Sequence, residues 1–94
     1  MGTMVSHRAL ACSSTQAGSL PILYQSISEY STAAYEYYQL TGNITNYNYG
    51  HSYMVTYNNY SNWMSSLDKG YCVTLTNEII AFTGSIRAYK NNIV

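Results

Sequence analysis

The chain has 94 residues, and its four basic and four acidic side chains give a formal net charge of zero. This length suits one domain with its own core. The few scattered cations exclude a basic patch that binds nucleic acid through its phosphates, unless many copies are arrayed around that nucleic acid. Because no uncharged apolar stretch reaches the roughly 18 residues of a membrane span, we expect no membrane-spanning helix.

Tyrosine dominates the aromatic residues, with twelve Tyr against one Phe and one Trp. A tyrosine ring is apolar but its hydroxyl needs a hydrogen-bond partner, so tyrosine suits half-wet surfaces and subunit interfaces. A net charge near zero also favours association between molecules. Either the tyrosines fill a loose core with their hydroxyls at its rim, or neighbouring subunits share them.

Residues 1–18 show no sustained hydrophobic period and end in small and polar residues. They predict a flexible N-terminal arm that is disordered or extended when free. Residues 19–94 carry three stripes of apolar side chains spaced alternately three and four residues apart, which keeps each stripe on one face of an α-helix. The sequence therefore predicts an all-α fold, a small antiparallel three-helix arrangement that follows the arm.

The first predicted helix covers residues 20–41. Ser19 is a good N-cap, Pro21 is tolerated in a first turn where no backbone N–H is needed, and Gly42 suits a left-handed residue after the last turn. The apolar stripe of this helix consists of Leu23, Ile27, Tyr30, Ala34 and Tyr37.

Residues 42–50 are rich in Asn and Gly, which adopt turn conformations at low cost, and predict a connecting loop. The second predicted helix covers residues 52–69 and ends before Gly70. Many Asn, Ser and Thr residues lower its helix propensity, so a strand over residues 53–57 is a rival interpretation. We prefer the helix because the three–four spacing continues through Tyr53, Tyr57, Tyr60, Met64 and Leu67.

The third predicted helix covers residues 73–90, with Thr74 or Thr76 as its N-cap and Glu78 in its first turn. A short strand at its start is the alternative, because this segment is rich in β-branched residues. The stripe of this helix consists of Cys72, Leu75, Ile79, Phe82, Ile86, Tyr89 and Ile93.

Additional apolar residues widen the face of the third helix. Val73 and Ile80 indicate that this helix is central and touches both others. Gly84 lies in mid-helix, where it predicts either close approach of a neighbouring helix or a kink. Short connections predict that helices adjacent in sequence run antiparallel. We expect the most buried side chains to be Ile27, Tyr30, Tyr57, Met64, Ile79, Phe82 and Ile86.

The two cysteines, Cys12 and Cys72, leave two interpretations open. They could form one disulfide that ties the arm to the third helix in an oxidising setting, or Cys72 could be a free thiol that acts as a small apolar core residue. The second interpretation is preferred. With His7 and His51 the cysteines show no paired ligand spacing, so no metal site is expected.

The chain offers little for catalysis. No nucleophile elbow, phosphate-binding glycine loop or Cys–His pairing is present, and the carboxylates Glu29, Glu36, Asp68 and Glu78 are spread along the sequence. We therefore expect no enzymatic activity and no cofactor. Three short patterns allow modification: N-glycosylation at Asn43 or Asn59, of which Asn43 lies on a predicted loop, and N-myristoylation at Gly2.

Small size, neutrality, a surface of Ser, Thr, Asn and Tyr, and a flexible arm favour a structural, self-assembling subunit such as a virion coat or filament protein. In size and composition the chain resembles helical coat subunits of rod-shaped and filamentous archaeal viruses, a similarity of composition and predicted helices only. The alternative is a small adaptor that uses its tyrosine-rich residues 47–60 as a contact patch. For assembly, the expected contacts between copies are the aromatic residues off the main stripes, Tyr24, Tyr35, Tyr38 and Trp63, together with the arm.

Overall fold

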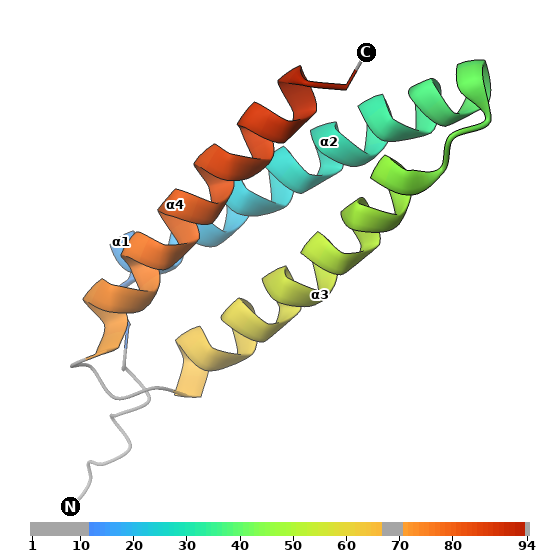
Figure 1. Cartoon of the computed structure of the whole chain (residues 1–94). Coiled ribbons are helices and arrows are strands. Elements are labelled where there is room, and N and C mark those ends of the chain that lie inside the picture. The colour runs from blue at the N-terminus through green and yellow to red at the C-terminus, as the bar shows by residue number, and fades with distance from the viewer. Residues whose placement is uncertain (1–11, 67–70, 94) are drawn as a thin grey trace, which may run out of the picture.

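The structure is a computed structural model of the whole chain, in which residues 12–66 and 71–93 are described. Over these ranges the chain forms a short helix α1 (Ser14–Ala17) and three long helices, α2 (Ser19–Thr41), α3 (Thr45–Ser66) and α4 (Cys72–Asn91). The long helices lie side by side as an elongated bundle, in which α3 runs antiparallel to α2 and α4 (Figure 1). The predicted all-α fold is confirmed, and residues 53–57 are helical rather than a strand.

Helix α2 follows the prediction to within one residue. It ends at Gly42, whose φ of 79° is left-handed and whose N–H donates to the carbonyl of Tyr38 at 2.7 Å. This is the expected role of a glycine after the last turn. Ser19 is not the N-cap, as predicted, but the first residue of the helix, and Gly18 takes the N-cap position. The Ser19 hydroxyl donates a hydrogen bond to the carbonyl oxygen of Gln16 at 2.9 Å, which joins α2 to α1.

Helix α3 begins seven residues earlier than predicted, because the connection covers only residues 42–44. The Oδ1 of Asn43 accepts a hydrogen bond from the backbone N–H of Thr45 at 3.0 Å, which turns the chain directly into the helix. Beyond it, Tyr47 packs on Tyr35 of α2 with ring centroids 5.6 Å apart. Packing on α2 therefore outweighs the turn preference of the Asn and Gly residues. The predicted end at residue 69 lies outside the described residues.

Helix α4 begins at Cys72, so the prediction of Thr74 or Thr76 as the N-cap is wrong. The N-cap is Tyr71, which makes no side-chain capping hydrogen bond. The helix also runs unbroken through Gly84, and no described heavy atom lies within 4 Å of an ideal β-carbon at this residue. Close approach of another helix of the same chain is therefore not the reason for this glycine.

The central helix is α2, which packs along the length of both α3 and α4. The prediction that the third helix is central is wrong, since Val73 and Ile80 remain 61% and 58% exposed. Small side chains such as Ser26 and Ala34 let the neighbouring backbones approach α2. Between α3 and α4, by contrast, Phe82 lies edge-on against Tyr53 and Tyr60, with centroids 5.6 and 6.0 Å away, and these rings hold the two backbones apart.

The core lies where the three long helices meet. Five of the seven residues predicted to be most buried belong to it, but Tyr57 and Phe82 are only partly buried because each lies at the margin between two helices. Burial of such aliphatic and aromatic side chains is the main favourable contribution to folding, at about 25 cal/mol per Å². The buried hydrophobic residues are Leu23, Ile27, Tyr30, Ala34, Tyr60, Met64, Cys72, Leu75, Ile79 and Ile86.

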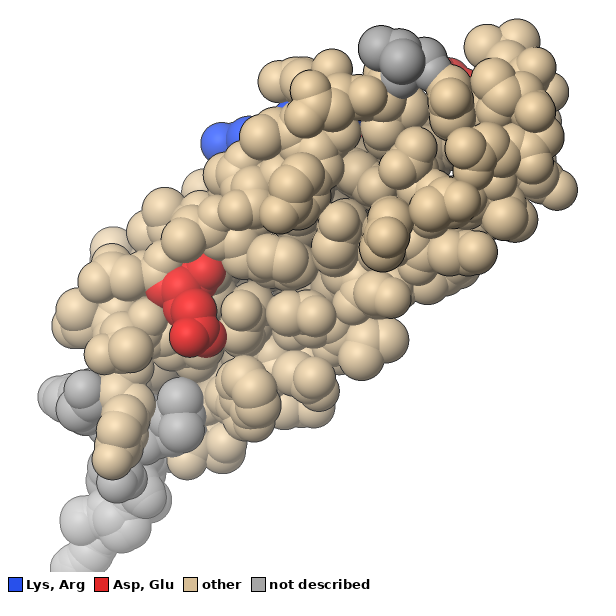
Figure 2. Space-filling model, viewed as in Figure 1, with Lys and Arg blue, Asp and Glu red and all other residues tan. Residues whose placement is uncertain are grey.

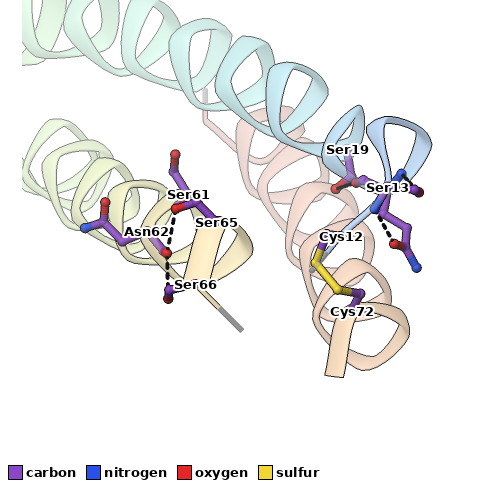
Figure 3. Close-up of a disulfide and its surroundings, with 9 residues drawn as sticks. Cys12, Ser13, Ser19, Ser61, Asn62, Ser65, Ser66 and Cys72 are labelled. Carbon is purple, nitrogen blue, oxygen red and sulfur yellow. Dashed lines mark hydrogen bonds between the residues drawn. A yellow bond between two sulfur atoms is a disulfide. The ribbon is translucent and has the colours of Figure 1, made fainter. Parts of the chain in front are cut away.

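A disulfide between Cys12 and Cys72 joins the segment before α1 to the first turn of α4, with Cα atoms 5.3 Å apart (Figure 3). The preferred interpretation of Cys72 as a free thiol is wrong, although the residue is fully buried as expected. The sequence could not decide this, because sixty residues separate the two cysteines and only the parallel arrangement of α2 and α4 brings them together.

The segment 12–18 is also more ordered than an arm. Ser13 and Gln16 form a capping box: the Ser13 hydroxyl accepts from the Gln16 N–H at 3.1 Å, and the Gln16 side chain accepts from the Ser13 N–H at 2.9 Å. These bonds order α1 internally, and the disulfide and the Ser19–Gln16 hydrogen bond join it to α4 and α2. The predicted flexible arm is therefore wrong for residues 12–18, and residues 1–11 lie outside the described ranges.

Candidate contact surface

The predicted contact residues of α2 form a row beside α3. Tyr24 is 49% exposed and lies edge-on to Tyr57 of α3, with ring centroids 5.3 Å apart. Tyr35 is 45% exposed and contacts both Tyr38 and Tyr47. Tyr38 is partly buried. Each of these rings is supported on one side by another aromatic ring and leaves its other side to solvent, which is how aromatic side chains are arranged in many interfaces.

Trp63 lies apart from that row, on the edge of α3 that faces α4. Its ring meets Tyr60 edge-on at 6.0 Å, and it is 48% exposed. Beside it an open cleft of about 230 Å³ is lined by Tyr71, Leu75 and Glu78 of the α4 end. The four residues predicted as contacts therefore occupy two separate surfaces, one on each side of α3.

A cluster of tyrosines that the sequence did not single out lies between the ends of α3 and α4. Tyr53 stacks near Tyr49 and Tyr89, at 6.4 and 6.2 Å, and meets Tyr30 edge-on at 5.1 Å. The Tyr30 hydroxyl donates to Oδ1 of Asn46 at 3.4 Å. These rings border a cleft of about 330 Å³, and none of the described residues that line it is charged. Tyr30, Tyr53 and Tyr89 belong to three different stripes and Tyr49 belongs to none, so only the fold brings them together.

Burial changes the acidity of this cluster. It raises the pKa of Tyr30 to about 12, with a further contribution from the neighbouring Tyr53 hydroxyl. Burial also raises the pKa of Tyr53. The pKa of Tyr60 is raised mainly by burial and further by the nearby Glu78 carboxylate. The hydroxyls of Tyr30, Tyr53 and Tyr60 are therefore protonated at neutral pH and act as hydrogen-bonding groups.

Large apolar side chains remain exposed on each of the three long helices, and few charged residues lie between them. In the view of Figure 2, acidic atoms show mainly at one place, a few basic atoms show at one edge, and most of the remaining described surface belongs to uncharged residues. Only 9% of the chain is charged, against about a quarter in typical soluble domains. The exposed large hydrophobic residues are Ile22, Tyr24, Tyr35, Leu40, Ile44, Tyr49, Val55, Trp63, Tyr71, Val73, Ile80 and Tyr89.

A further hollow, larger than the two clefts above, is an open, mainly apolar groove of about 670 Å³ between α4 and the α1–α2 corner. Ile22 of α2 and Ile80 of α4 lie along it, and both are at least half exposed. The backbone of Gly84 forms part of its lining, and Arg87 is the one charged residue among the described residues that line it. Sequence reasoning placed Ile80 on a widened apolar face of the third helix that touches both other helices, because hydrophobicity alone does not reveal which of two apolar faces is covered.

No grouping of three or more His, Cys, Asp or Glu side chains suited to a metal ion occurs in the described part of the chain. His51, the one described histidine, lies edge-on to Tyr47 at 4.9 Å. Asn43 is exposed on the α2–α3 connection and Asn59 is exposed on α3, whereas Gly2 lies outside the described residues. None of the helices within residues 12–66 and 71–93 is both long and apolar enough to cross a membrane.

Comparisons with known protein families, with characterised proteins and with solved structures gave no match to this chain.

Proposed function

We propose that the protein is a structural subunit that assembles with copies of itself, in the manner of a virion coat or filament protein. The observation that carries this proposal is the number of large apolar side chains left exposed on a folded chain with so few charges. Soluble monomers rarely expose apolar patches beyond a few hundred Å², and larger patches usually mark contact surfaces. Net charge near zero removes the repulsion that would keep such surfaces apart.

The arrangement of these residues also supports a repeated contact. The Tyr24–Tyr35 row and the Trp63 cleft lie on different sides of α3, and the apolar groove lies on the far side of α4. A subunit with several separate contact surfaces can join more than one neighbour, which a coat or filament requires. The disulfide suits a particle exposed to an oxidising environment.

The adaptor alternative depends on residues 47–60 as a free tyrosine-rich patch. Of the five tyrosines in this segment, Tyr47, Tyr53, Tyr57 and Tyr60 are at least partly buried, and only Tyr49 is exposed. Packing between the helices therefore uses most of that patch, and the assembly proposal is the better supported one. Nucleic acid would be a partner only in an array, where Arg87 and Lys90 of many α4 helices recur along one surface.

Sedimentation velocity over a range of concentrations, with electron microscopy of the same sample, tests the proposal. We expect ordered particles or oligomers that grow with concentration. A chain that stays monomeric and folded at high concentration would overturn the proposal. Substituting Tyr24 and Trp63 separately by Ser should each weaken growth of the particles while leaving the helical content unchanged, because both side chains are about half exposed in the monomer.

A further inference from the structure

A second stripe of side chains runs along α4, on the side opposite the one that meets α3. Its six residues are spaced four, three, four, three and four apart, which keeps them on one helix face. All six are exposed, although such spacing marks the buried face elsewhere in the chain. They are Val73, Asn77, Ile80, Gly84, Arg87 and Asn91.

The centre of this stripe consists of a projecting side chain followed one turn later by a gap. Ile80 is 58% exposed, and four residues further on Gly84 has no described heavy atom within 4 Å of an ideal β-carbon. Both line the groove of about 670 Å³, where Ile22 of α2 adds another half-exposed apolar side chain. A glycine in mid-helix weakens the helix, and no contact within the described chain explains its presence here.

The stripe is symmetric about position 82. If a second α4 helix is laid antiparallel on the first with its two-fold axis at this position, Ile80 of each copy lies over Gly84 of the other. The same operation pairs Asn77 with Arg87 and Val73 with Asn91. One surface therefore provides both the projection and the gap that receives it, as the self-complementary interface of a two-fold dimer requires.

We propose that two copies of the chain associate through this stripe, with their α4 helices antiparallel and Ile80 of each seated over Gly84 of the other. This inference rests on the proposed self-assembly and names one of its contacts. A two-fold contact closes after two copies, so the Tyr24–Tyr35 row and the Trp63 cleft would then join dimers into larger particles.

The cation Arg87 in the groove favours the antiparallel orientation. Ten residues separate the two Arg87 positions along an antiparallel pair, about 15 Å at 1.5 Å per residue. This exceeds the Debye length of about 8 Å at physiological ionic strength, so their repulsion is largely screened. Each guanidinium can instead donate to the side-chain oxygen of the partner's Asn77. A parallel pair would place the two Arg87 side chains together and set Ile80 against Ile80, which leaves both gaps empty.

Filling the gap provides the first test. Gly84→Leu should fit the monomer, because the space around this residue is open, and should raise Tm, because Leu is a better helix former than Gly. The same side chain should block Ile80 of the partner and weaken dimerisation about tenfold or more, as at other central contact sites. Asn62→Leu, at an exposed position of α3, is the matched control and should leave the dimer constant unchanged.

Cysteine pairing tests the orientation. A mixture of the Ile80→Cys and Gly84→Cys variants should form a disulfide-linked heterodimer under mild oxidation, while each variant alone should cross-link far less. The antiparallel contact would be contradicted if either variant cross-linked efficiently with itself and the mixture formed no Ile80→Cys/Gly84→Cys heterodimer.

The outcomes separate this inference from the proposal on which it rests. If the wild-type chain associates and Gly84→Leu associates equally well, the α4 stripe is not an interface. The proposed self-assembly would then depend on the Tyr24–Tyr35 row and the Trp63 cleft. If the wild-type chain remains monomeric at every concentration in sedimentation, both the proposed function and this contact are overturned.

Discussion

The hydroxyl oxygen of Ser31 on α2 lies 2.6 Å from the position that a β-carbon on Gly50 of α3 would occupy. A contact that short is not tolerated between a carbon and an oxygen atom, so a β-carbon at residue 50 would force the Ser31 hydroxyl to move. Gly50 is fully inside α3 and buried, and this close approach explains a glycine that the sequence had suggested as part of a loop.

A double-mutant cycle on this pair tests the close approach. Gly50→Ala gains about 1 kcal/mol of helix propensity but forces the Ser31 side chain to move, so we expect little net change or a loss of stability. With Ser31→Ala the nearest remaining atom is its β-carbon, at an ordinary 3.6 Å, and Gly50→Ala in that background should stabilise the protein by about 1 kcal/mol. Urea denaturation measures all four free energies of unfolding, and strictly additive effects would contradict the close contact.

The disulfide should contribute strongly to stability. Cross-linking residues sixty positions apart lowers the entropy of the unfolded chain, which corresponds to about 4 kcal/mol at 25 °C. Cys12→Ala should therefore lower the free energy of unfolding by an amount of that order, and reducing agent should do the same to the wild-type protein. Reducing agent should not change the variant further. Equal melting temperatures with and without reductant would show that the bond does not constrain the chain.

Two adjacent isoleucines provide a matched pair for the core. Ile79 is fully buried and Ile80 is 58% exposed. Ile79→Ala should cost about 2–5 kcal/mol, as large core truncations do, whereas Ile80→Ala should change the stability of the monomer by no more than about 0.5 kcal/mol. Denaturation at a concentration where the protein is monomeric checks both values. Similar losses at the two positions would place the buried face of α4 elsewhere.

Stability should fall at high pH because of Tyr30. The pKa of this hydroxyl is about 12 in the folded protein and about 10 in the unfolded chain. Below pH 10 both states keep the proton, so the stabilising contribution is complete there. From about pH 10 to 12 the unfolded chain loses the proton first, and stability should fall by up to about 1.4 kcal/mol per pH unit.

Tyr30→Phe should flatten that decline, because the residue no longer titrates. The measurement is the free energy of unfolding by urea at a series of alkaline pH values. Tyr71→Phe, which removes a hydroxyl from an exposed ring, controls for the substitution itself. A wild-type slope that survives in Tyr30→Phe would assign the decline to other groups.

Two truncations separate the roles of the N-terminal residues. Deleting residues 1–11 keeps the disulfide and α1, so the bundle should remain as stable as the full chain while assembly weakens. Deleting residues 1–18 also removes Cys12 and should lower Tm in addition. Circular dichroism and sedimentation measure the two effects. If the variant that lacks residues 1–11 assembled as well as the wild-type chain, these residues would not contribute to the contacts between copies.

The sequence by itself determined that the chain forms three long helices, although not where α3 begins, because helical periodicity is a local property. Leu23, Ile27 and Ile79 recur at helical spacing and are buried as predicted. Gly42 terminates α2 at the expected residue, since only glycine adopts a left-handed φ at low cost. These properties involve neighbours within a few positions along the chain, so no knowledge of the fold was needed.

Only the tertiary structure decided how the helices share their faces. The pattern of apolar residues could not show that α2 is the central helix. That position depends on the small side chains that let two helices approach α2 and on the aromatic rings that separate α3 from α4. The pattern also could not show that Cys12 meets Cys72, or that Ile80 and Gly84 stay uncovered. Each is a relationship between segments far apart in sequence, and the packing of the whole bundle, rather than the propensity of any one segment, sets it.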